Sequence, residues 1–317
     1  MAILVTGGAG FIGSNLLRRL AGRGENLVCL DNFDDFYDPA RKRKNIQSLV
    51  ASGEVTLREG DVRDAGLCLS ILEDHSVSVI YHLAARPGPR PSIQNAPLYQ
   101  DVNCGGTVSI LEAAVKAGVE RFIFASSSSV YAGGAQVPFR EDSPADRPFS
   151  PYGATKRACE LLCYAYHHVH GLPVVCTRLF SVYGPGLRPD LAVYKFTDLM
   201  LQGKPVPVYG DGGSGRDYTY VSDILDGLVA CLDAGFGYEI VNLGNSHTVG
   251  LLEMIDLIAR TLGVEPALEH LPPNPADPPV TCADLSKASR VLGFQPKVSI
   301  QEGIARFVEW FKAEARS

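Results

Sequence analysis

Several features that mark particular classes of protein are missing from this sequence. No apolar run reaches the roughly 20 residues that a membrane-spanning helix needs, so we expect no membrane partner. There is no excess of positive charge, because 35 acidic side chains outnumber 29 basic ones and give a net charge of -6. That balance argues against nucleic acid as a partner and favours a small-molecule substrate.

The cysteines lack a pattern as well. Eight of them are scattered through apolar surroundings, without a CxxC pair or the ligand spacing of a zinc site. We therefore predict free thiols and no bound metal. The chain opens directly on an aliphatic run at residues 2–5, with no basic segment or cleavage signal, which favours a cytoplasmic protein.

What is present is an alternation of short aliphatic runs with helical stretches. Strands are predicted at residues 3–5, 27–30, 55–57, 79–83 and 121–125, and helices at 11–21, 99–117 and 152–169. The alternation predicts an α/β protein with a doubly wound parallel sheet of Rossmann type at residues 1–180. Loops rich in proline and glycine beyond residue 180 predict a smaller C-terminal α/β substrate domain at 181–317, with some segments crossing back.

A glycine-rich turn follows the first predicted strand. The stretch GGAGFIG at residues 7–13 has GxxGxxG spacing, which lets the backbone approach a pyrophosphate at a helix N-terminus. Asp31 follows the next strand about twenty residues on, where an acid binds the adenosine ribose hydroxyls and favours NAD over NADP. A turn cap is the alternative role for Asp31. Asp61, after the third strand, can similarly reach the adenine.

A tyrosine and a lysine stand four residues apart at the start of a predicted helix. Tyr152 and Lys156 share one helical face, so the ammonium can lie beside the phenol and make the tyrosine a usable base. The preceding strand ends in a serine run, residues 126–129, whose hydroxyls can bind a substrate oxygen. An isolated pair of this kind also fits an ordinary amphipathic helix, but the glycine turn upstream favours catalysis.

These motifs, with the HLAA stretch at residues 82–85, resemble the extended short-chain dehydrogenase/reductase family over nearly the whole chain. The resemblance implies NAD in the first domain, a nucleotide sugar in the second, and often a homodimer through helices such as 99–117 and 152–169. It implies a catalytic set of Ser127, Tyr152 and Lys156. The residues it assigns to the cofactor are Gly7, Gly10, Phe11, Ile12, Gly13, Asp31, Asn32, Asp61, Val62, Leu83, Ala84, Ala85, Asn103, Ala125, Tyr152 and Lys156.

Within the family, the serine run separates the chemistries. Ser128 and Ser129 stand where 4,6-dehydratases carry Asp-Glu, and decarboxylases that form UDP-xylose carry a glutamate at the second position. The stretches 30–39, 181–190 and 195–197 are similar to UDP-glucuronate 4-epimerases. That similarity implies a sugar carboxylate held by Arg188 with three serines, and a guanidinium fork suits a planar carboxylate. A phosphate or surface contact is the alternative for Arg188.

The same similarity assigns the rest of the substrate site. Arg216 matches a diphosphate position, Phe196, Val208 and Tyr209 lie around the uracil, and Asp277 lies on the ribose or phosphate side. The full substrate set is Ser127, Ser128, Ser129, Ser181, Arg188, Ala192, Val193, Phe196, Val208, Tyr209, Arg216 and Asp277. Pro87, Pro89 and Pro91 depart from the pattern, in a loop that reads nearer AGVRYS in relatives.

The expected function is NAD-dependent 4-epimerisation of a UDP-sugar through a 4-keto intermediate, with UDP-glucuronate and UDP-galacturonate as the first candidates. Three alternatives stay open. The substrate can be UDP-glucose or UDP-N-acetylglucosamine, the reaction can be decarboxylation of UDP-glucuronate, or the chain can be a non-catalytic NAD-binding sensor.

Overall fold

The computed structural model describes every residue except 132, 134–135, 236 and 315–317. Its centre is a seven-stranded sheet with the order β10-β6-β5-β4-β1-β2-β3, in which every pair is parallel. The strands are β1 (Ala2–Thr6), β2 (Asn26–Asp31), β3 (Val55–Glu59), β4 (Val79–His82), β5 (Arg121–Ser127), β6 (Val174–Leu179) and β10 (Tyr238–Leu243). This order is that of a Rossmann sheet with one added strand, as predicted.

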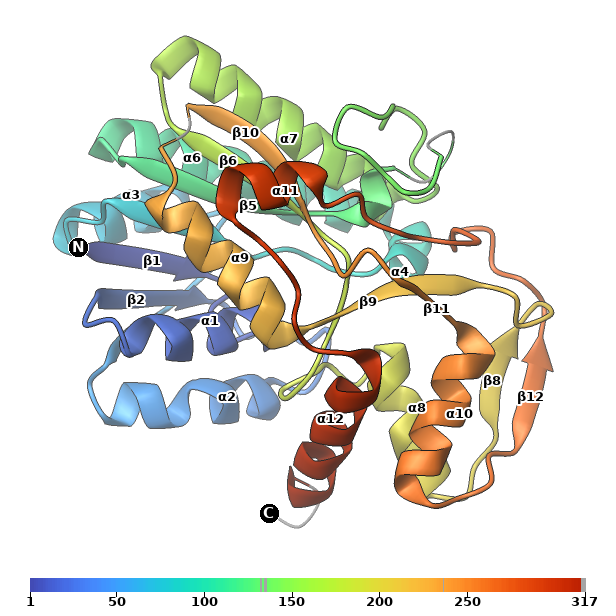
Figure 1. Cartoon of the computed structure of the whole chain (residues 1–317). Coiled ribbons are helices and arrows are strands. Elements are labelled where there is room, and N and C mark those ends of the chain that lie inside the picture. The colour runs from blue at the N-terminus through green and yellow to red at the C-terminus, as the bar shows by residue number, and fades with distance from the viewer. Residues whose placement is uncertain (132, 134–135, 236, 315–317) are drawn as a thin grey trace.

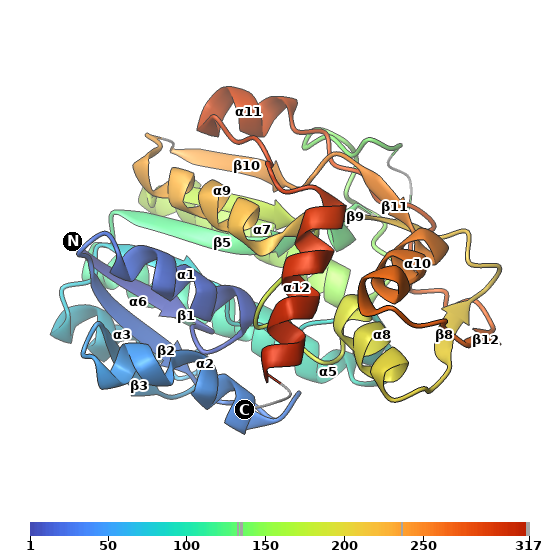
Figure 2. The same ribbon diagram turned by 60° about the horizontal axis from the view of Figure 1, so that its bottom comes forward.

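Helices cover both faces of the sheet (Figure 1 and Figure 2). One face carries α1 (Phe11–Ala21), α2 (Pro39–Ala51) and α9 (Val221–Asp233), and the other carries α3 (Ala65–Asp74), α6 (Gly106–Ala117) and α7 (Pro151–His170). Because side chains alternate along a strand, Ile3 and Val5 belong to one core and Leu4 to the other. The two cores hold the sheet rigid between the helical layers.

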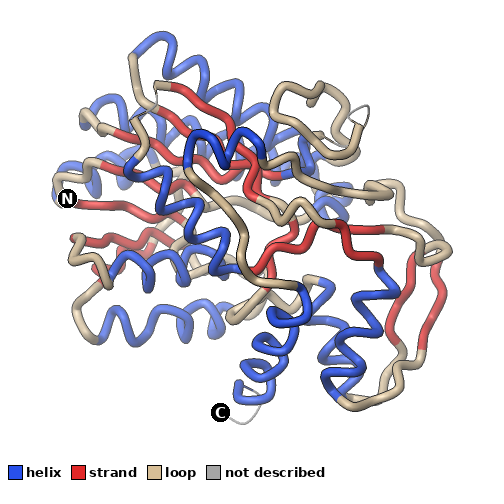
Figure 3. The backbone as a smooth tube through the Cα atoms, in the orientation of Figure 1, coloured by secondary structure: helices blue, strands red, loops and turns tan. Residues whose placement is uncertain are grey.

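The second part of the chain is smaller and has long connecting loops (Figure 3). Its three-stranded sheet contains β7 (Ser181–Tyr183), β9 (Gly215–Tyr220) and β11 (Thr248–Gly250), and a strand pair contains β8 (Val206–Tyr209) and β12 (Leu268–Leu271). The accompanying helices are α8 (Ala192–Leu201), α10 (Leu251–Leu262), α11 (Ser286–Leu292) and α12 (Ile300–Glu314). Although α9 and β10 come from beyond residue 180, they lie with the main sheet, because β10 pairs with β6.

The helices that frame the predicted catalytic residues begin and end on local signals. Ser150 caps α7 by accepting a hydrogen bond from the backbone N–H of Gly153 at 3.2 Å. Gly118 and Gly171 end α6 and α7 with φ angles of 70° and 71°, which glycine adopts readily. These helix ends agree with the prediction.

The predicted helix over 99–117 is more complex than expected. The short helices α4 (Pro89–Gln94) and α5 (Ala96–Tyr99) lead into a π-helical turn, η1 (Gln100–Gly105), which continues into α6. A π turn carries one more residue per hydrogen-bonded ring than an α turn and is frequent at functional sites. Here it contains Asn103, whose contacts shape the wall of the cleft described below.

None of the helices in the described ranges combines the length and apolar character needed to cross a membrane. The same residues contain no group of three His, Cys, Asp or Glu side chains that could hold a metal ion. All eight cysteines are described and carry free thiols, and seven of them are buried.

Candidate active site

One cleft of about 660 Å³ runs along the carboxyl edge of the main sheet, between the sheet and the second part of the chain. Ligands of open parallel sheets bind at this edge, where the strand order reverses. In this sheet the reversal falls between β1 and β4. The cleft therefore lies where the fold predicts a dinucleotide.

All but two of the predicted site residues line this cleft. Val208 is completely buried in the core, and its strand neighbours Pro207 and Tyr209 line the cleft instead. Asn103 lies behind the wall, where its side chain accepts from the backbone N–H of Arg86 at 2.7 Å and donates to Thr155 Oγ1 at 3.0 Å. Asn103 thus ties the loop after β4 to α7.

The glycine turn has the close packing that a dinucleotide site requires. Gly7 has a φ of +67°, and a Cβ there would lie 2.8 Å from the backbone nitrogen of Ala84. A Cβ on Gly13 would lie 2.3 Å from the carbonyl oxygen of Gly7. Only glycine fits at these two positions, and the open backbone at the start of α1 is a fitting cradle for a pyrophosphate.

Asp31 ends β2 beside this turn. One carboxylate oxygen accepts from the backbone N–H of Ala9 at 3.0 Å and the other from that of Phe33 at 2.8 Å. Burial raises the pKa of Asp31, while these hydrogen bonds and the charge of Lys42 act in the opposite direction. The carboxylate is thereby held at the cofactor end of the cleft, where a ribose can share its oxygens.

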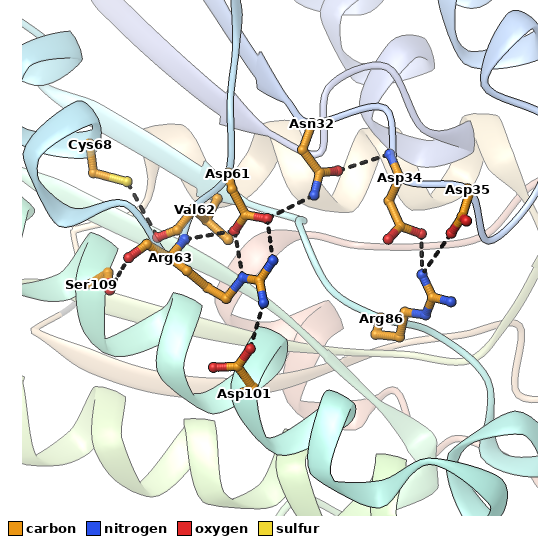
Figure 4. A network of polar contacts seen from close by, with 10 residues as sticks. All are labelled: Asn32, Asp34, Asp35, Asp61, Val62, Arg63, Cys68, Arg86, Asp101 and Ser109. Atoms are coloured by element: carbon orange, nitrogen blue, oxygen red, sulfur yellow. Dashed lines mark hydrogen bonds and ion pairs between the residues drawn. The ribbon is translucent and has the colours of Figure 1, made fainter.

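A second acidic residue, Asp61, sits in a polar network at the rim of the cleft (Figure 4). Its carboxylate accepts from Asn32 Nδ2 at 2.9 Å and from Arg63 Nη2 at 2.8 Å. The hydrogen bond from Arg63 is the main reason why the pKa of Asp61 is lowered to about 2. Arg63 also reaches Asp101 in the π-helical turn at 2.5 Å, which links the rim to α6.

The residues predicted to be catalytic come from β5 and from the first turns of α7. The ammonium of Lys156 is buried and donates to the carbonyl oxygen of Ala125 at 2.7 Å. Tyr152, one turn earlier, lines the cleft, and its backbone N–H donates to Ser92 Oγ at 3.1 Å. Ser127 ends β5, and its hydroxyl lies 3.2 Å from Ser129 Oγ. The predicted serine, tyrosine and lysine therefore share one cleft.

Two buried contacts behind these residues hold them in place. Glu160, two turns along α7 from Tyr152, accepts from Ser126 Oγ at 2.5 Å and from Arg178 Nη2 at 2.7 Å. This ties the helix to the ends of β5 and β6. Burial alone would raise the pKa of Glu160, but the hydrogen bond and charge of Arg178, together with the hydrogen bonds from Ser126 and Arg157, lower that pKa.

His82, at the end of β4, is buried with both ring nitrogens in contact with hydroxyls. Nδ1 lies 2.7 Å from Thr6 Oγ1, and Nε2 lies 3.1 Å from Thr107 Oγ1. Burial, with a smaller effect of the Lys156 charge, lowers the pKa of His82 to about 3. At neutral pH the ring is uncharged and joins β1, β4 and α6 beneath the cleft.

Arg188 lines the cleft in the loop between β7 and α8. Its Nε and Nη2 donate to the two carboxylate oxygens of Asp190 at 2.9 and 3.0 Å. Burial alone would lower the pKa of Arg188, but Asp190 outweighs it and raises the pKa. Ser181, Ala192, Val193 and Phe196 line the same region.

Two further arginines, Arg90 and Arg216, also line the cleft. Arg90 binds Asp277 with an Nη2–Oδ2 distance of 2.5 Å and stacks on Tyr209, with Cζ 4.0 Å from the ring centroid. Arg216 hydrogen-bonds to the backbone carbonyl of Gly215 at 2.8 Å. Two cations therefore face a single carboxylate, and the surplus positive charge suits a diphosphate.

The sequence interpretation missed several residues of the cleft. Phe36, Tyr37 and Lys42, from the segment after β2, line it together with Arg86 and Arg90. The hydroxyl of Tyr37 is buried and has no hydrogen-bond partner among the described residues. Similarity of the stretch 30–39 to one subgroup was the only signal that pointed to this segment.

The sheet order, the glycine turn and the Ser-Tyr-Lys set together define a class: a Rossmann-fold enzyme of the extended short-chain dehydrogenase/reductase type. Comparison makes the assignment specific. The chain belongs to the NAD dependent epimerase/dehydratase family, whose model matches residues 3–244, and NAD is its cofactor.

Among its relatives is a UDP-glucuronate 4-epimerase of Thermodesulfobacterium geofontis, which is 40% identical over 98% of this chain and 95% of the relative. Among solved structures, UDP-glucuronic acid 4-epimerase from Bacillus cereus in complex with UDP-glucuronic acid and NAD is 36% identical. It has a TM-score of 0.94 and covers 99% of this chain and 100% of the relative. UDP-glucose 4-epimerase from Thermotoga maritima with UDP-glucose is 30% identical, with a TM-score of 0.92 and coverage of 99% and 100%.

Proposed function

We propose that this protein is an NAD-dependent UDP-sugar 4-epimerase whose substrate pair is UDP-glucuronate and UDP-galacturonate. The observation that carries the choice of an acidic sugar is the orientation of Arg188 in the cleft. Asp190 occupies the Nε–Nη2 edge of its guanidinium, and among the described residues no hydrogen bond is made to Nη1. The free end can bind a second carboxylate, and relatives named UDP-glucuronate 4-epimerase support that ligand.

Tyr152, Ser127 and Lys156 act at the C4 hydroxyl of the sugar. Tyr152 removes the hydroxyl proton and returns it later, while Ser127 donates a hydrogen bond to the same oxygen. Lys156, anchored on Ala125, supplies a fixed positive charge on the same face of α7. When bound, NAD would supply the acceptor for the C4 hydride and the source of its return to the opposite face. Between the two hydride transfers the substrate is a 4-keto sugar, which rotates in the cleft to present its opposite face.

The carboxylate contacts also protect the substrate. The 4-keto form of a glucuronate is a β-keto acid. It loses carbon dioxide when the C5–C6 bond lies parallel to the π orbitals of the C4 ketone. Arg188 and the hydroxyls of Ser128, Ser129 and Ser181 hold the carboxylate away from that alignment. Serine at 128 and 129 leaves no acid beside the ketone, which argues against elimination of water.

The test is a substrate panel of UDP-glucuronate, UDP-glucose and UDP-N-acetylglucosamine, with products identified by NMR. We expect UDP-galacturonate from the first and little turnover of the other two. Tyr152→Phe should abolish turnover while NAD stays bound. Preferred turnover of a neutral sugar, or release of carbon dioxide as the main reaction, would replace the proposal with the corresponding rival.

We also propose that the protein is a cytoplasmic homodimer. The exposed apolar side chains Leu161, Tyr164 and Val169 lie along α7, with exposed fractions of 55%, 51% and 69%. Exposed apolar side chains on α7 suit a bundle in which α6 and α7 pack against the same helices of a second copy. Light scattering should give twice the mass of the chain, and a monomer would contradict the proposal.

A further inference from the structure

Two loops flank the glycine turn at the cofactor end of the cleft. In the sheet, β1 lies between β2 and β4. The loops that follow β2 (residues 32–38) and β4 (residues 83–88) therefore rise on either side of the turn that follows β1. Any side-chain bridge between these two loops has to pass over the carboxyl end of β1, which is where a dinucleotide crosses the sheet.

Such a bridge is present (Figure 4). Arg86, from the loop after β4, contacts Asp34 of the loop after β2 through Nη1 and Oδ1, and its Nη1 lies 3.8 Å from Asp35 Oδ1. The side chain of Arg86 is only 19% exposed, and its Cζ lies 5.1 Å from the ring centroid of Phe36. Arg86, Asp34 and Phe36 all line the cleft.

Both ends of this bridge are anchored. Asn103 accepts from the backbone N–H of Arg86 at 2.7 Å and donates to its carbonyl oxygen at 3.2 Å. On the other side, the backbone carbonyl oxygen of Asp34 accepts from Lys42 Nζ at 2.6 Å. The backbone N–H of Asp34 donates to Asn32 Oδ1 at 3.0 Å. The pair therefore joins two fixed points and does not link two freely moving side chains.

We propose that the Arg86–Asp34 bridge closes over bound NAD and slows its release. The fit of the glycine turn to a dinucleotide and the position of the bridge above that turn carry this inference. Its benefit depends on the proposed function, because an epimerase must keep the reduced cofactor until the hydride has been returned. The effect on NAD release does not depend on the identity of the sugar.

The direct alternative is that Arg86 leaves Asp34 and binds a cofactor phosphate itself. The two ideas differ in what Asp34 does. In a bridge, loss of either partner opens the same contact, so Arg86→Gln and Asp34→Asn have the same effect and the double variant adds nothing. In direct phosphate binding, Asp34→Asn frees Arg86 and leaves NAD bound as tightly or more tightly.

The experiment measures the exchange of bound NAD for isotopically labelled NAD by mass spectrometry, without sugar substrate. We expect each single variant to release NAD about three- to tenfold faster than the wild type, and the double variant to match the singles. Raised salt should speed release from the wild type and have little effect on the variants. Thermal melting of each variant without NAD checks that the fold is intact.

Arg140→Gln is the matched control, because it removes an exposed arginine–aspartate pair outside the cleft, with Asp142. Its release rate should equal that of the wild type. Unchanged release in both single variants, additive effects, or faster release in Arg86→Gln alone would overturn the bridge. Faster release in a protein that fails to epimerise any UDP-sugar would leave the bridge standing and reject the proposed function.

Discussion

Asp190 accepts two parallel hydrogen bonds from one edge of the Arg188 guanidinium, from Nε at 2.9 Å and from Nη2 at 3.0 Å. A guanidinium has a second fork at its outer end, and this contact fixes the direction in which that fork points. Asp190 thus positions the residue that we assign to the sugar carboxylate. An arginine free to rotate would bind the same carboxylate less tightly and in more than one orientation.

We therefore predict that Asp190→Asn weakens the handling of acidic sugars. The KM for UDP-glucuronate should rise about tenfold, since a bidentate charge-assisted contact loses its orientation. Any turnover of UDP-glucose should change little. The fraction of product that has lost carbon dioxide should increase, which steady-state kinetics and NMR can measure together.

Asp256→Asn is a matched control for this change, because Asp256 makes the same two-bond contact with Arg260 on an exposed helix face. It should leave both KM and product ratio at wild-type values. If Asp190→Asn changes UDP-glucuronate and UDP-glucose turnover equally, the positioning role is wrong.

The tyrosines Tyr37 and Tyr131 make a second comparison. Burial raises the pKa of Tyr37 to about 12, so its hydroxyl is protonated at neutral pH, yet it has no partner among the described residues. Tyr131 is also buried, but its hydroxyl donates to Asn242 Oδ1 at 2.7 Å. Removing a satisfied hydroxyl leaves its partner unpaired, whereas removing an unsatisfied one does not.

Tyr37→Phe should therefore leave the free energy of unfolding of the ligand-free protein unchanged or raise it by up to about 1 kcal/mol. Tyr131→Phe should lower it by about 1–2 kcal/mol. Urea denaturation of both variants beside the wild type measures the difference. Equal losses in the two would show that Tyr37 has a partner in the ligand-free state.

The buried pair of Glu160 and Arg178 should be important for stability. Both side chains are almost wholly inaccessible, so Arg178→Met removes the main charge partner of a buried carboxylate and leaves it only the partly exposed Arg157 and the hydroxyl of Ser126. We expect a loss of about 3–5 kcal/mol in the free energy of unfolding. Breaking the exposed pair of Arg260 and Asp256 should lower the free energy of unfolding by no more than about 0.5 kcal/mol. A similar loss of unfolding free energy for both pairs would mean that burial does not determine how much each pair stabilises the fold.

The neutral state of His82 predicts a pH dependence of stability. Its pKa is about 3 in the folded protein and 6.5 in the unfolded chain. Below 6.5 the unfolded chain binds a proton that the folded protein does not. Stability is therefore complete above that pH and falls toward pH 3, by up to about 1.4 kcal/mol per pH unit.

Urea denaturation at pH 7.5 and 5.5 tests this prediction against His82→Asn, which lacks the titrating group. The wild type should lose more stability than the variant between the two pH values, by about 1.4 kcal/mol. The contributions of all other groups are common to both proteins and cancel. Parallel losses would mean that the ring takes up a proton in the folded state.

Much of this site was open to prediction because its signals are local. The glycine turn, Asp31 after β2, and Tyr152 with Lys156 are each defined by spacing along one strand or helix, and all lie on the cleft. The position of Val208 was less predictable. Val208 faces the core while Tyr209 faces the cleft, because neighbours on a strand point to opposite sides.

Asn103 and Arg86 show why other parts were not open to prediction. Asn103 matched the family pattern, but its side chain holds the backbone of Arg86 from behind the wall. That contact requires the π-helical turn η1, for which the residues at 100–105 carry no clear signal. Arg86 itself stands in a loop whose prolines depart from relatives, so similarity assigned it no role.

By itself the sequence determined the sheet class and predicted the cofactor turn and the catalytic set, because hydrophobic period, glycine conformation and residue spacing act over a few residues. Only the tertiary structure decided which charges meet. Arg86 contacts Asp34, 52 residues away in the chain, because their loops follow β4 and β2, the two strands that flank β1. Arg90 contacts Asp277, 187 residues away, because the second part of the chain folds back over the edge of the sheet. Ion pairs of this kind are formed by the path of the chain in space, and no local pattern specifies the partner.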